Sequence, residues 1–206
     1  MEKVNTKREI LKASLDLFST QGYESTSVAQ IADAVGIKKA TVYSHFSSKQ
    51  QILDDIIEIV SREYSKRSFF ADDNQRNESY EKTFENFADD EILSMILSHV
   101  NFIVKNQQVS KVRKMLTIEQ FQNVKLKEMQ TKRNYDDVMN YFVGLVKCLI
   151  EQNKLQNNDP EVMAAQLCLP ISVWINLCDR EPERIDETMN LVEKHIKLFF
   201  KTYGTI

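Results

Sequence analysis

The sequence has few of the residues that interrupt regular secondary structure. Its 206 residues include four Gly and three Pro, and residues 37–143 contain neither, although average usage is about 7% Gly and 5% Pro. Turn-rich all-β architectures need these residues at frequent intervals. The content of 42% hydrophobic and 28% charged residues excludes disordered and collagen-like chains. We therefore expect an almost wholly helical globular protein.

Cysteines and long apolar runs are also scarce. Cys148, Cys168 and Cys178 stand at no metal-like spacing, and the last two, if they share one helix, would lie about 15 Å apart, too far for a disulfide. We expect buried apolar cysteines, with a redox switch as the weaker alternative. The least charged stretch, residues 162–178, is shorter than the roughly 20 residues of a membrane span and predicts a buried helix.

The first residues and the overall charge exclude little by themselves. Residues 1–10 lack the apolar core of a secretory signal, so we expect a cytoplasmic protein. The net charge of −3 gives no global reason to expect a polyanionic partner. Residues 34–53, however, contain three lysines and no acidic residue. They suggest a surface that faces a polyanion, although three lysines are also compatible with an ordinary solvated face.

Capping patterns divide the N-terminal region into short helices. A Thr-x-x-Glu pattern at residues 6–9 predicts a helix over residues 7–20, which Gly22 would end. A further pattern at residues 47–51, with Ser47 or Ser48 as the cap, predicts a helix that continues to about residue 66. The positive end of its dipole would suit a DNA phosphate.

The two helices between them have the spacing of a helix-turn-helix. Ser27 and Gln30 form a capping box that opens a helix over residues 28–35, and a second helix is expected over residues 38–46. The turn contains Gly36, and a small residue, Ala32, stands where the two helices would cross. This pattern favours a DNA-binding unit.

These residues together resemble the DNA-binding domain of TetR-family transcriptional regulators. The resemblance covers about a quarter of the chain and rests on an ordered set of short matches: Ile10 to Phe18, Gly22-Tyr23, Thr26-Ser27-Val28, Ile31-Ala32, Gly36-Ile37, Thr41-Val42-Tyr43, His45-Phe46, Ser48-Lys49 and Leu53. Ala40 fits the small residue common at the start of the family's recognition helix.

The resemblance implies roles for eight residues of this region. Phosphate contacts fall on Tyr43, His45 and Lys49, and extend to the cap Ser27. The side chains expected to reach base edges are Lys38, Lys39, Thr41 and Ser44, since lysine donates to guanine O6 and N7 and a hydroxyl both donates and accepts. Tyr43 and His45 also have an ordinary alternative, partial packing against the first helix.

The remaining sequence predicts more helices with less certain ends. Residues 68–79 are expected to be a loop, and Asp159-Pro160 is a good helix start. Pro170 should disturb the helix that follows. The expected helices span about residues 90–106, 110–121, 125–153, 159–178 and 181 onward.

The resemblance also implies the domain organisation. We expect an all-α protein with a three-helix helix-turn-helix DNA-binding domain over residues 1–48 and a helical effector-binding and dimerisation domain over residues 49–206. The last two helices would form the homodimer interface, which would give a palindromic DNA site. The alternative is that these two helices only complete the core of one subunit.

A small-molecule effector is a further implication of the resemblance. An apolar pocket in the C-terminal helices could be lined by Phe102, Met115, Phe121, Met139, Phe142 and Trp174, with polar His99, Asn140, Gln166 and Asn176 to orient a ligand. The same apolar side chains at helical spacing are more often part of a plain core. Local motifs assemble no catalytic, metal or cofactor site, so we expect no enzyme and no cofactor.

The sequence therefore predicts a homodimeric TetR-like repressor that a small-molecule effector releases from a palindromic operator. The first alternative is a TetR-like DNA-binding protein that is controlled by a protein partner or acts as an activator. The alternative from another class is a helical ligand carrier or enzyme with a vestigial DNA-binding domain.

Overall fold

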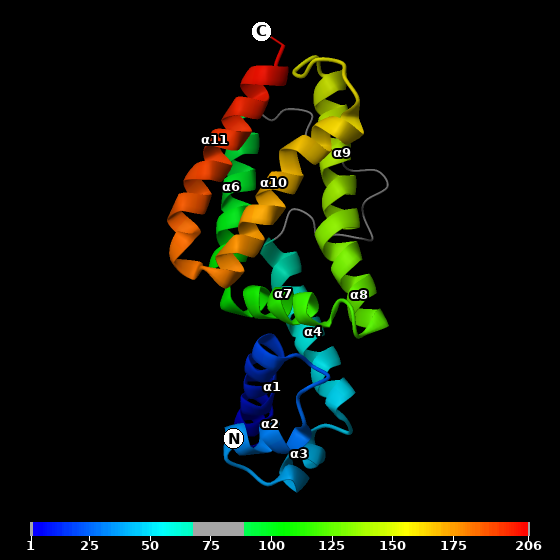
Figure 1. Ribbon diagram of the computed structural model, residues 1–206, viewed down its shortest axis with the longest axis vertical. Helices are drawn as coiled ribbons and strands as arrows, with labels where there is room; N and C mark the ends of the chain where they lie inside the picture. Colours follow the sequence, from blue (N-terminus) through cyan, green and yellow to red (C-terminus); the bar gives the residue numbers. More distant parts are fainter. Residues whose placement is uncertain (1, 68–88, 206) are drawn as a thin grey trace. The chain divides into compact units, whose positions relative to one another are not determined.

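A computed structural model describes residues 2–67 and 89–205, with side chains placed over residues 6–64 and 91–205. Every regular element in this part of the chain is a helix (Figure 1). The only extended backbone pairing over these residues is an isolated bridge between Leu155 and Gly204. The predicted all-α class is confirmed. The predicted loop at residues 68–79 lies outside the described residues.

The chain divides into two compact units. The first comprises residues 1–66 and 107–130, and the second comprises residues 67–106 and 131–206. The first unit thus holds later helices as well as the predicted DNA-binding residues 1–48. Compactness reports contacts rather than function, so the functional boundary at residues 48 and 49 remains a prediction.

The first unit consists of six helices around an apolar core. They are α1 (Glu2–Gln21), α2 (Val28–Val35), α3 (Lys39–His45), α4 (Lys49–Arg67), α7 (Gln107–Glu119) and α8 (Val124–Thr131). Fully buried Phe18, Ile31 and Phe46 come from different helices or their ends. Burial of such side chains contributes about 1.5–3 kcal/mol each, so this core holds the short helices α2 and α3, which would be marginal in isolation.

The helix starts of the first unit follow the sequence in two places and differ in one. Ser27 accepts from the Gln30 backbone N–H while the Gln30 side chain accepts from the Ser27 N–H, which confirms the predicted capping box of α2. Ser48 caps α4 by accepting from the Gln51 N–H. The predicted cap at Thr6 is wrong, because α1 begins at Glu2 and residues 2–6 continue the same helix.

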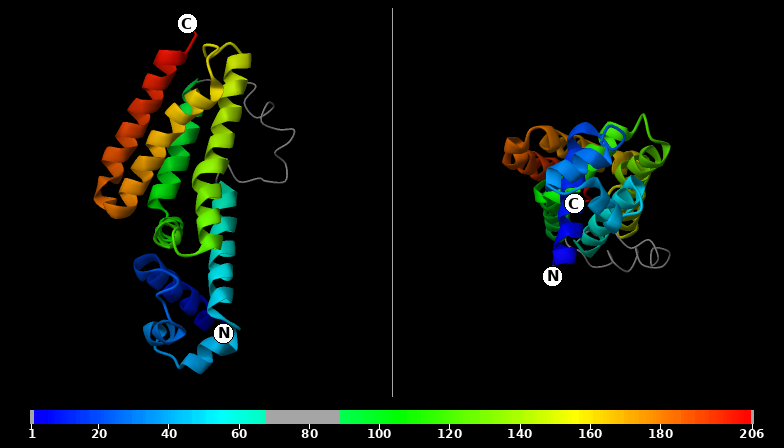
Figure 2. Two further views of the ribbon diagram at one scale, coloured as in Figure 1. Left: turned by 45° about the vertical axis from the view of Figure 1, so that its right-hand side comes forward. Right: turned by 90° about the horizontal axis from the view of Figure 1, so that it is seen from below.

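The second unit is a bundle of longer helices that lie alongside one another (Figure 2). Its elements are α6 (Asp89–Lys105), a π-helical turn (Lys132–Asp136), α9 (Asp137–Glu151), α10 (Pro160–Arg180), a 3-10 turn (Pro182–Arg184) and α11 (Ile185–Tyr203). The helix predicted over residues 125–153 is thus two α-helices joined by a π turn. Such turns are rare and widen the helix by one residue.

Helix α10 starts as predicted and has two kinds of face. Asp159 caps it by accepting from the backbone N–H groups of Glu161 and Val162, with Pro160 at the first helical position, and the helix continues through Pro170. Among the described helices, α10 alone is long and apolar enough to cross a membrane. One face is buried against α9 and α11, whereas Val173 on another face is 63% exposed. The predicted burial therefore holds for one side of the helix.

Candidate DNA-binding interface

The turn between α2 and α3 has the geometry that the sequence predicts for a helix-turn-helix. Gly36 adopts the left-handed conformation (φ 74°), and its N–H donates to the carbonyls that end α2. The following N–H, from Ile37, donates to Ala32 O at 3.0 Å. A side chain at residue 36 would be strained in this backbone conformation, so glycine sets the direction in which α3 leaves the turn.

Helix α3 presents a polar surface on an apolar anchor. Val42 is 1% exposed and Phe46, directly after the helix, is equally buried. Lys38, Lys39 and Ser44 are exposed, and Thr41 is half-buried. The four side chains predicted to reach base edges therefore lie at the solvent-accessible part of one short helix and its N-terminal cap.

Tyr43 and Lys39 form a local pair on this surface. The Tyr43 ring is 48% exposed, and the Lys39 Nζ lies 5.9 Å from its centroid. A cation at this distance from an aromatic face is weakly attracted to it. The pair restricts both side chains and leaves the phenol oxygen and the ammonium group at the surface.

Lys49 has contacts that the sequence does not predict. Its Nζ donates to Tyr23 O at 2.7 Å and to Thr26 O at 3.0 Å, and it lies 4.2 Å from the centroid of the Tyr23 ring. A third carbonyl, Glu24 O, lies at 3.4 Å, at the limit of a hydrogen bond. The half-buried lysine thus holds the turn between α1 and α2. An ammonium has three donors, so a phosphate would take the place of this longest contact.

Helix α7 also contacts the turn between α1 and α2. Glu119 is 2% exposed, and its Oε1 accepts from the Glu24 backbone N–H at 3.1 Å. Gly22 permits this approach, because a Cβ there would lie 2.5 Å from Oε1. In addition, the Asn123 side chain donates to the Glu24 carboxylate at 3.0 Å. Sequence reasoning missed these contacts because their partners are more than ninety residues apart, and no local pattern links them.

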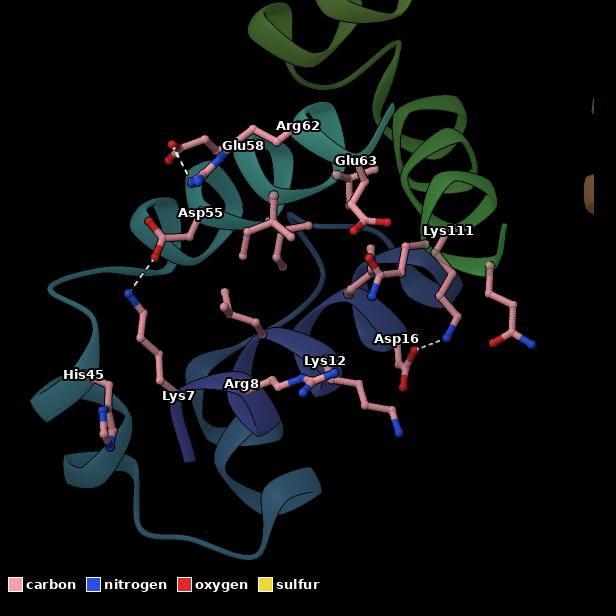
Figure 3. A pocket seen from close by; sticks show the side chains of 17 residues that line it. Lys7, Arg8, Lys12, Asp16, His45, Asp55, Glu58, Arg62, Glu63 and Lys111 are labelled. Atoms are coloured by element: carbon pink, nitrogen blue, oxygen red, sulfur yellow. Dashed lines mark hydrogen bonds and ion pairs between the residues drawn. The ribbon is translucent and has the colours of Figure 1, made fainter. Parts of the chain in front are cut away.

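A surface cavity of about 1050 Å³ lies between α1, α4 and the start of α7 (Figure 3). Its apolar lining includes Leu11, Leu15 and Ile56, and half-buried His45 lies at its edge. Several charged residues that line the cavity form ion pairs: Lys7 with Asp55 at 2.9 Å, Arg62 with Glu58 at 2.7 Å, and Lys111 with Asp16. The lining thus carries both signs of charge and does not select one class of ligand.

The six apolar candidates for an effector pocket lie in different environments. Met115 and Phe121 belong to the first unit, and Phe102, Met139, Phe142 and Trp174 belong to the second. Phe121 is 89% exposed at the end of α7, whereas Met115 is fully buried. None of the six lines the cavity of Figure 3.

Of the four candidates in the second unit, Met139 and Trp174 lie at contacts between helices. Phe142 is buried with its ring against Tyr141, and Met139 Sδ lies 3.6 Å from Cys168 Sγ. The Trp174 and His195 rings contact each other edge-to-face, with their centroids 5.5 Å apart. Of the polar candidates, Asn140 and Gln166 are exposed, and Asn176 donates to Ser172 O within its own helix.

Two buried titratable groups of the second unit are held in their neutral forms. His99 is 5% exposed, and burial lowers its pKa from 6.5 to about 4. Burial raises the pKa of the Cys168 thiol to about 12, so this group is not a reactive thiolate at neutral pH. Over the described residues, no group of three or more His, Cys, Asp or Glu side chains could hold a metal ion.

Residues 10–56 match the model of the family described as bacterial regulatory proteins, tetR family. Among curated proteins, the chain is 40% identical over 58 residues to the HTH-type transcriptional regulator AcrR of Shigella flexneri, covering 28% of this chain and 27% of AcrR. It is 30% identical over 125 residues to the uncharacterised HTH-type transcriptional regulator YerO of Bacillus subtilis, covering 56% of this chain and 43% of YerO. The chain thus spans less than half the length of these relatives.

The likeness extends over the whole chain in the solved structures. SmeT, the repressor of the Stenotrophomonas maltophilia multidrug efflux pump SmeDEF, shares the fold with a TM-score of 0.62 at 17% identity, covering 97% of this chain and 90% of SmeT. At this identity the comparison establishes the fold and does not transfer a ligand.

Proposed function

This chain belongs to the TetR family through its N-terminal domain, and on that premise we propose that it is a homodimeric, sequence-specific transcriptional repressor. The observation that carries the proposal is the surface of α3 and its N-terminal cap, where Lys38, Lys39 and Ser44 are exposed on a helix anchored by buried Val42. No acidic residue occurs between residues 34 and 53. Such a helix suits the major groove, where lysine and hydroxyl side chains meet base edges.

Contacts to the DNA backbone would orient this helix. We assign them to Ser27 at the start of α2, to Tyr43 and His45 on α3, and to Lys49 at the start of α4. The Ser27 hydroxyl oxygen caps α2, which leaves its O–H as a donor for a phosphate. Phosphate contacts fix orientation without reading sequence, so these four residues should affect all duplexes alike.

Dimerisation is proposed through the last two long helices. Val173 on α10 is 63% exposed and Leu198 on α11 is 62% exposed, although both helices also contribute buried residues to their own unit. Large apolar side chains that gather at a surface are typical of an interface. A twofold dimer would present two recognition helices to successive major grooves about 34 Å apart, which requires a palindromic operator.

We also propose an effector site within the second unit, near Phe102, Met139, Phe142 and Trp174. SmeT has been solved in complex with triclosan, so one protein of this fold binds a small molecule. Release from DNA requires that the effector bind one conformation better than the other, since equal affinity for both would shift nothing. The proposed location in the cell is the cytoplasm, where the DNA is found.

Two other functions make different predictions. A family member controlled by a protein partner, or an activator, would bind an operator but would not lose it on addition of any small molecule. A helical carrier or enzyme with a vestigial N-terminal domain would bind or convert a ligand without salt-sensitive affinity for DNA.

Selection from a random duplex library tests the proposed function directly. Purified protein is incubated with the library at physiological salt, and the retained duplexes are sequenced. A recovered palindrome supports a dimeric sequence reader. If folded, dimeric protein enriches no sequence, with or without added candidate effectors, the proposal is wrong.

Variants assign the two kinds of contact in the same assay. Lys39→Ala should change which sequences are enriched, because it removes a donor to base edges. Lys147→Ala, which removes an exposed lysine from α9, is the matched control and should leave the preferred sequence unchanged. If Lys39→Ala recovers the same sequence as the unmodified protein, the base-contact assignment is wrong.

A further inference from the structure

We propose that Glu119 is a positioning residue that couples helix α7 to the DNA-reading helices α2 and α3. This inference rests on the proposed function, and it adds a regulatory contact within the first unit. The contact joins the last residue of α7 to the turn between α1 and α2, residues 22–26.

The turn is held at several points, and they come from two helices. Glu119 Oε1 on α7 accepts from the Glu24 N–H at 3.1 Å. Lys49 at the start of α4 donates to the carbonyls of Tyr23 and Thr26 at 2.7 and 3.0 Å. The turn therefore cannot move relative to α7 without breaking a bond to a buried carboxylate.

Glu119 lies close to the backbone of Gly22. Gly22 has φ +91°, and a Cβ at this position would lie 2.5 Å from Glu119 Oε1 and 3.0 Å from Ile118 Cγ2. The carboxylate thus occupies the space that a side chain at residue 22 would need. A displacement of the end of α7 would break the hydrogen bond from the Glu24 N–H to Glu119 Oε1, and packed elements tend to move between discrete arrangements rather than deform continuously.

A buried carboxylate is a poor choice if the contact served stability alone. Glu119 Oε2 has no hydrogen-bond partner within the described part of the chain, although it is buried. Burying such a group is costly, and an apolar side chain of similar size often stabilises a core at least as well. A directional acceptor, by contrast, specifies where the Glu24 N–H must lie.

The turn held by Glu119 leads directly into the start of α2. Ser27, three residues after Glu24, is the α2 cap and one of the proposed phosphate contacts. DNA that holds Ser27 and Lys49 would immobilise the turn, and the turn would immobilise the end of α7 through Glu119. Because coupling between two sites is reciprocal, a change that displaces α7 would weaken DNA binding by the same factor.

Amide hydrogen exchange of the unmodified protein tests this coupling without an identified effector. The probe is the duplex recovered from the library selection. The N–H groups of Gln122 and Asn123 both donate to Glu119 O at 3.0 Å, so they report how firmly the end of α7 is held. We expect operator DNA to slow their exchange. Operator binding that leaves their exchange unchanged would overturn the proposal while leaving the proposed function intact.

Three variants separate positioning from simple structural support. Glu119→Ala removes the acceptor and should weaken operator affinity by about tenfold and abolish the operator-dependent protection. Glu119→Gln keeps an oxygen acceptor and should restore both. Glu128→Ala removes an exposed carboxylate from α8 and controls for the lost negative charge, which by itself would favour DNA.

The readout is affinity per folded molecule, measured with the active fraction determined by titration against operator. If Glu119→Ala lowers only the melting temperature and binds operator with unchanged affinity, the residue is structural and the proposal is wrong. If the alanine variant does not fold, the exchange comparison on the unmodified protein decides the question.

Discussion

Replacing Lys49 tests two roles of one side chain, the stabilisation of the turn between α1 and α2 and the proposed contact with a DNA phosphate. The family resemblance assigns its ammonium to a DNA phosphate, whereas the structure shows it bonded to Tyr23 O and Thr26 O and lying 4.2 Å from the Tyr23 ring centroid. Lys49→Met keeps the apolar stem and removes the charge. We expect it to lower both the stability of the fold and the affinity for DNA.

The stability loss can be worked from these contacts. Hydrogen bonds to charged groups contribute about 1.5–3 kcal/mol each, and a cation–π contact at an exposed site adds about 0.5–1 kcal/mol. Lys49 is half-buried, so water replaces part of what is lost. We therefore expect a decrease of about 1–2 kcal/mol in the free energy of unfolding, and each kcal/mol lowers the melting temperature of a chain of this size by about 2–4 °C.

The expected effect of Lys49→Met on DNA binding can also be given a size. Each phosphate contact contributes about 0.9 to the magnitude of the slope of log K against log salt concentration. A dimer that loses one contact per subunit should therefore show a slope whose magnitude is smaller by about 1.8. Thermal unfolding followed by circular dichroism measures the first effect, and a salt titration of operator binding measures the second. Lys127→Met, on an exposed lysine of α8, is the control for both.

Either measurement can contradict the reasoning independently. An unchanged melting temperature would mean that the carbonyl contacts of Lys49 do not hold the turn. An unchanged salt slope alongside a lower melting temperature would restrict Lys49 to its structural role and remove it from the phosphate contacts.

Three other predictions follow from buried groups and from one glycine. Gly22→Ala should lower the melting temperature by several degrees, because the left-handed backbone (φ +91°) and the approach of Glu119 both exclude a side chain; an unchanged melting temperature would refute this close fit. His99 has its pKa lowered to about 4 by burial, so the unfolded chain binds more protons between about pH 6.5 and 4 and stability should fall by up to about 3 kcal/mol as the pH drops through this range. Urea unfolding at about pH 7 and about pH 5 should show about 2 kcal/mol of this loss, and His99→Gln should reduce it; equal dependence in both proteins would exclude His99 as the cause. Cys168, whose pKa is raised to about 12, should resist thiol reagents in the native protein and react after unfolding; rapid reaction of the native protein would contradict its burial.

Local patterns predicted most of the first unit correctly. The capping box of Ser27 and Gln30 uses atoms three residues apart, and the left-handed turn at Gly36 depends on one residue type, so both are visible in the sequence. The predicted capping box at Thr6 is wrong, because α1 begins upstream at Glu2. The residues of that pattern are equally compatible with the interior of a helix.

The sequence did not predict features that depend on where a helix ends or changes its pitch. Helix α7 ends at Glu119, and Phe121 lies exposed in the turn that follows, which helical periodicity does not predict. The π turn at residues 132–136 is likewise invisible to helical periodicity, because one inserted residue shifts the pattern by less than the uncertainty of the helix boundary.

The sequence by itself determined the helical class, the helix-turn-helix and the surface lysines of α3, because each depends on residue type and on spacings of three or four along one helix. Tertiary structure alone decided what holds that unit together. It brought the Lys49 ammonium to two carbonyls of a turn, and it brought Glu119 to the amide of Glu24 from 95 residues away. A hydrogen bond depends on distance in space, and two residues so far apart in the chain share no periodicity that would predict that they meet.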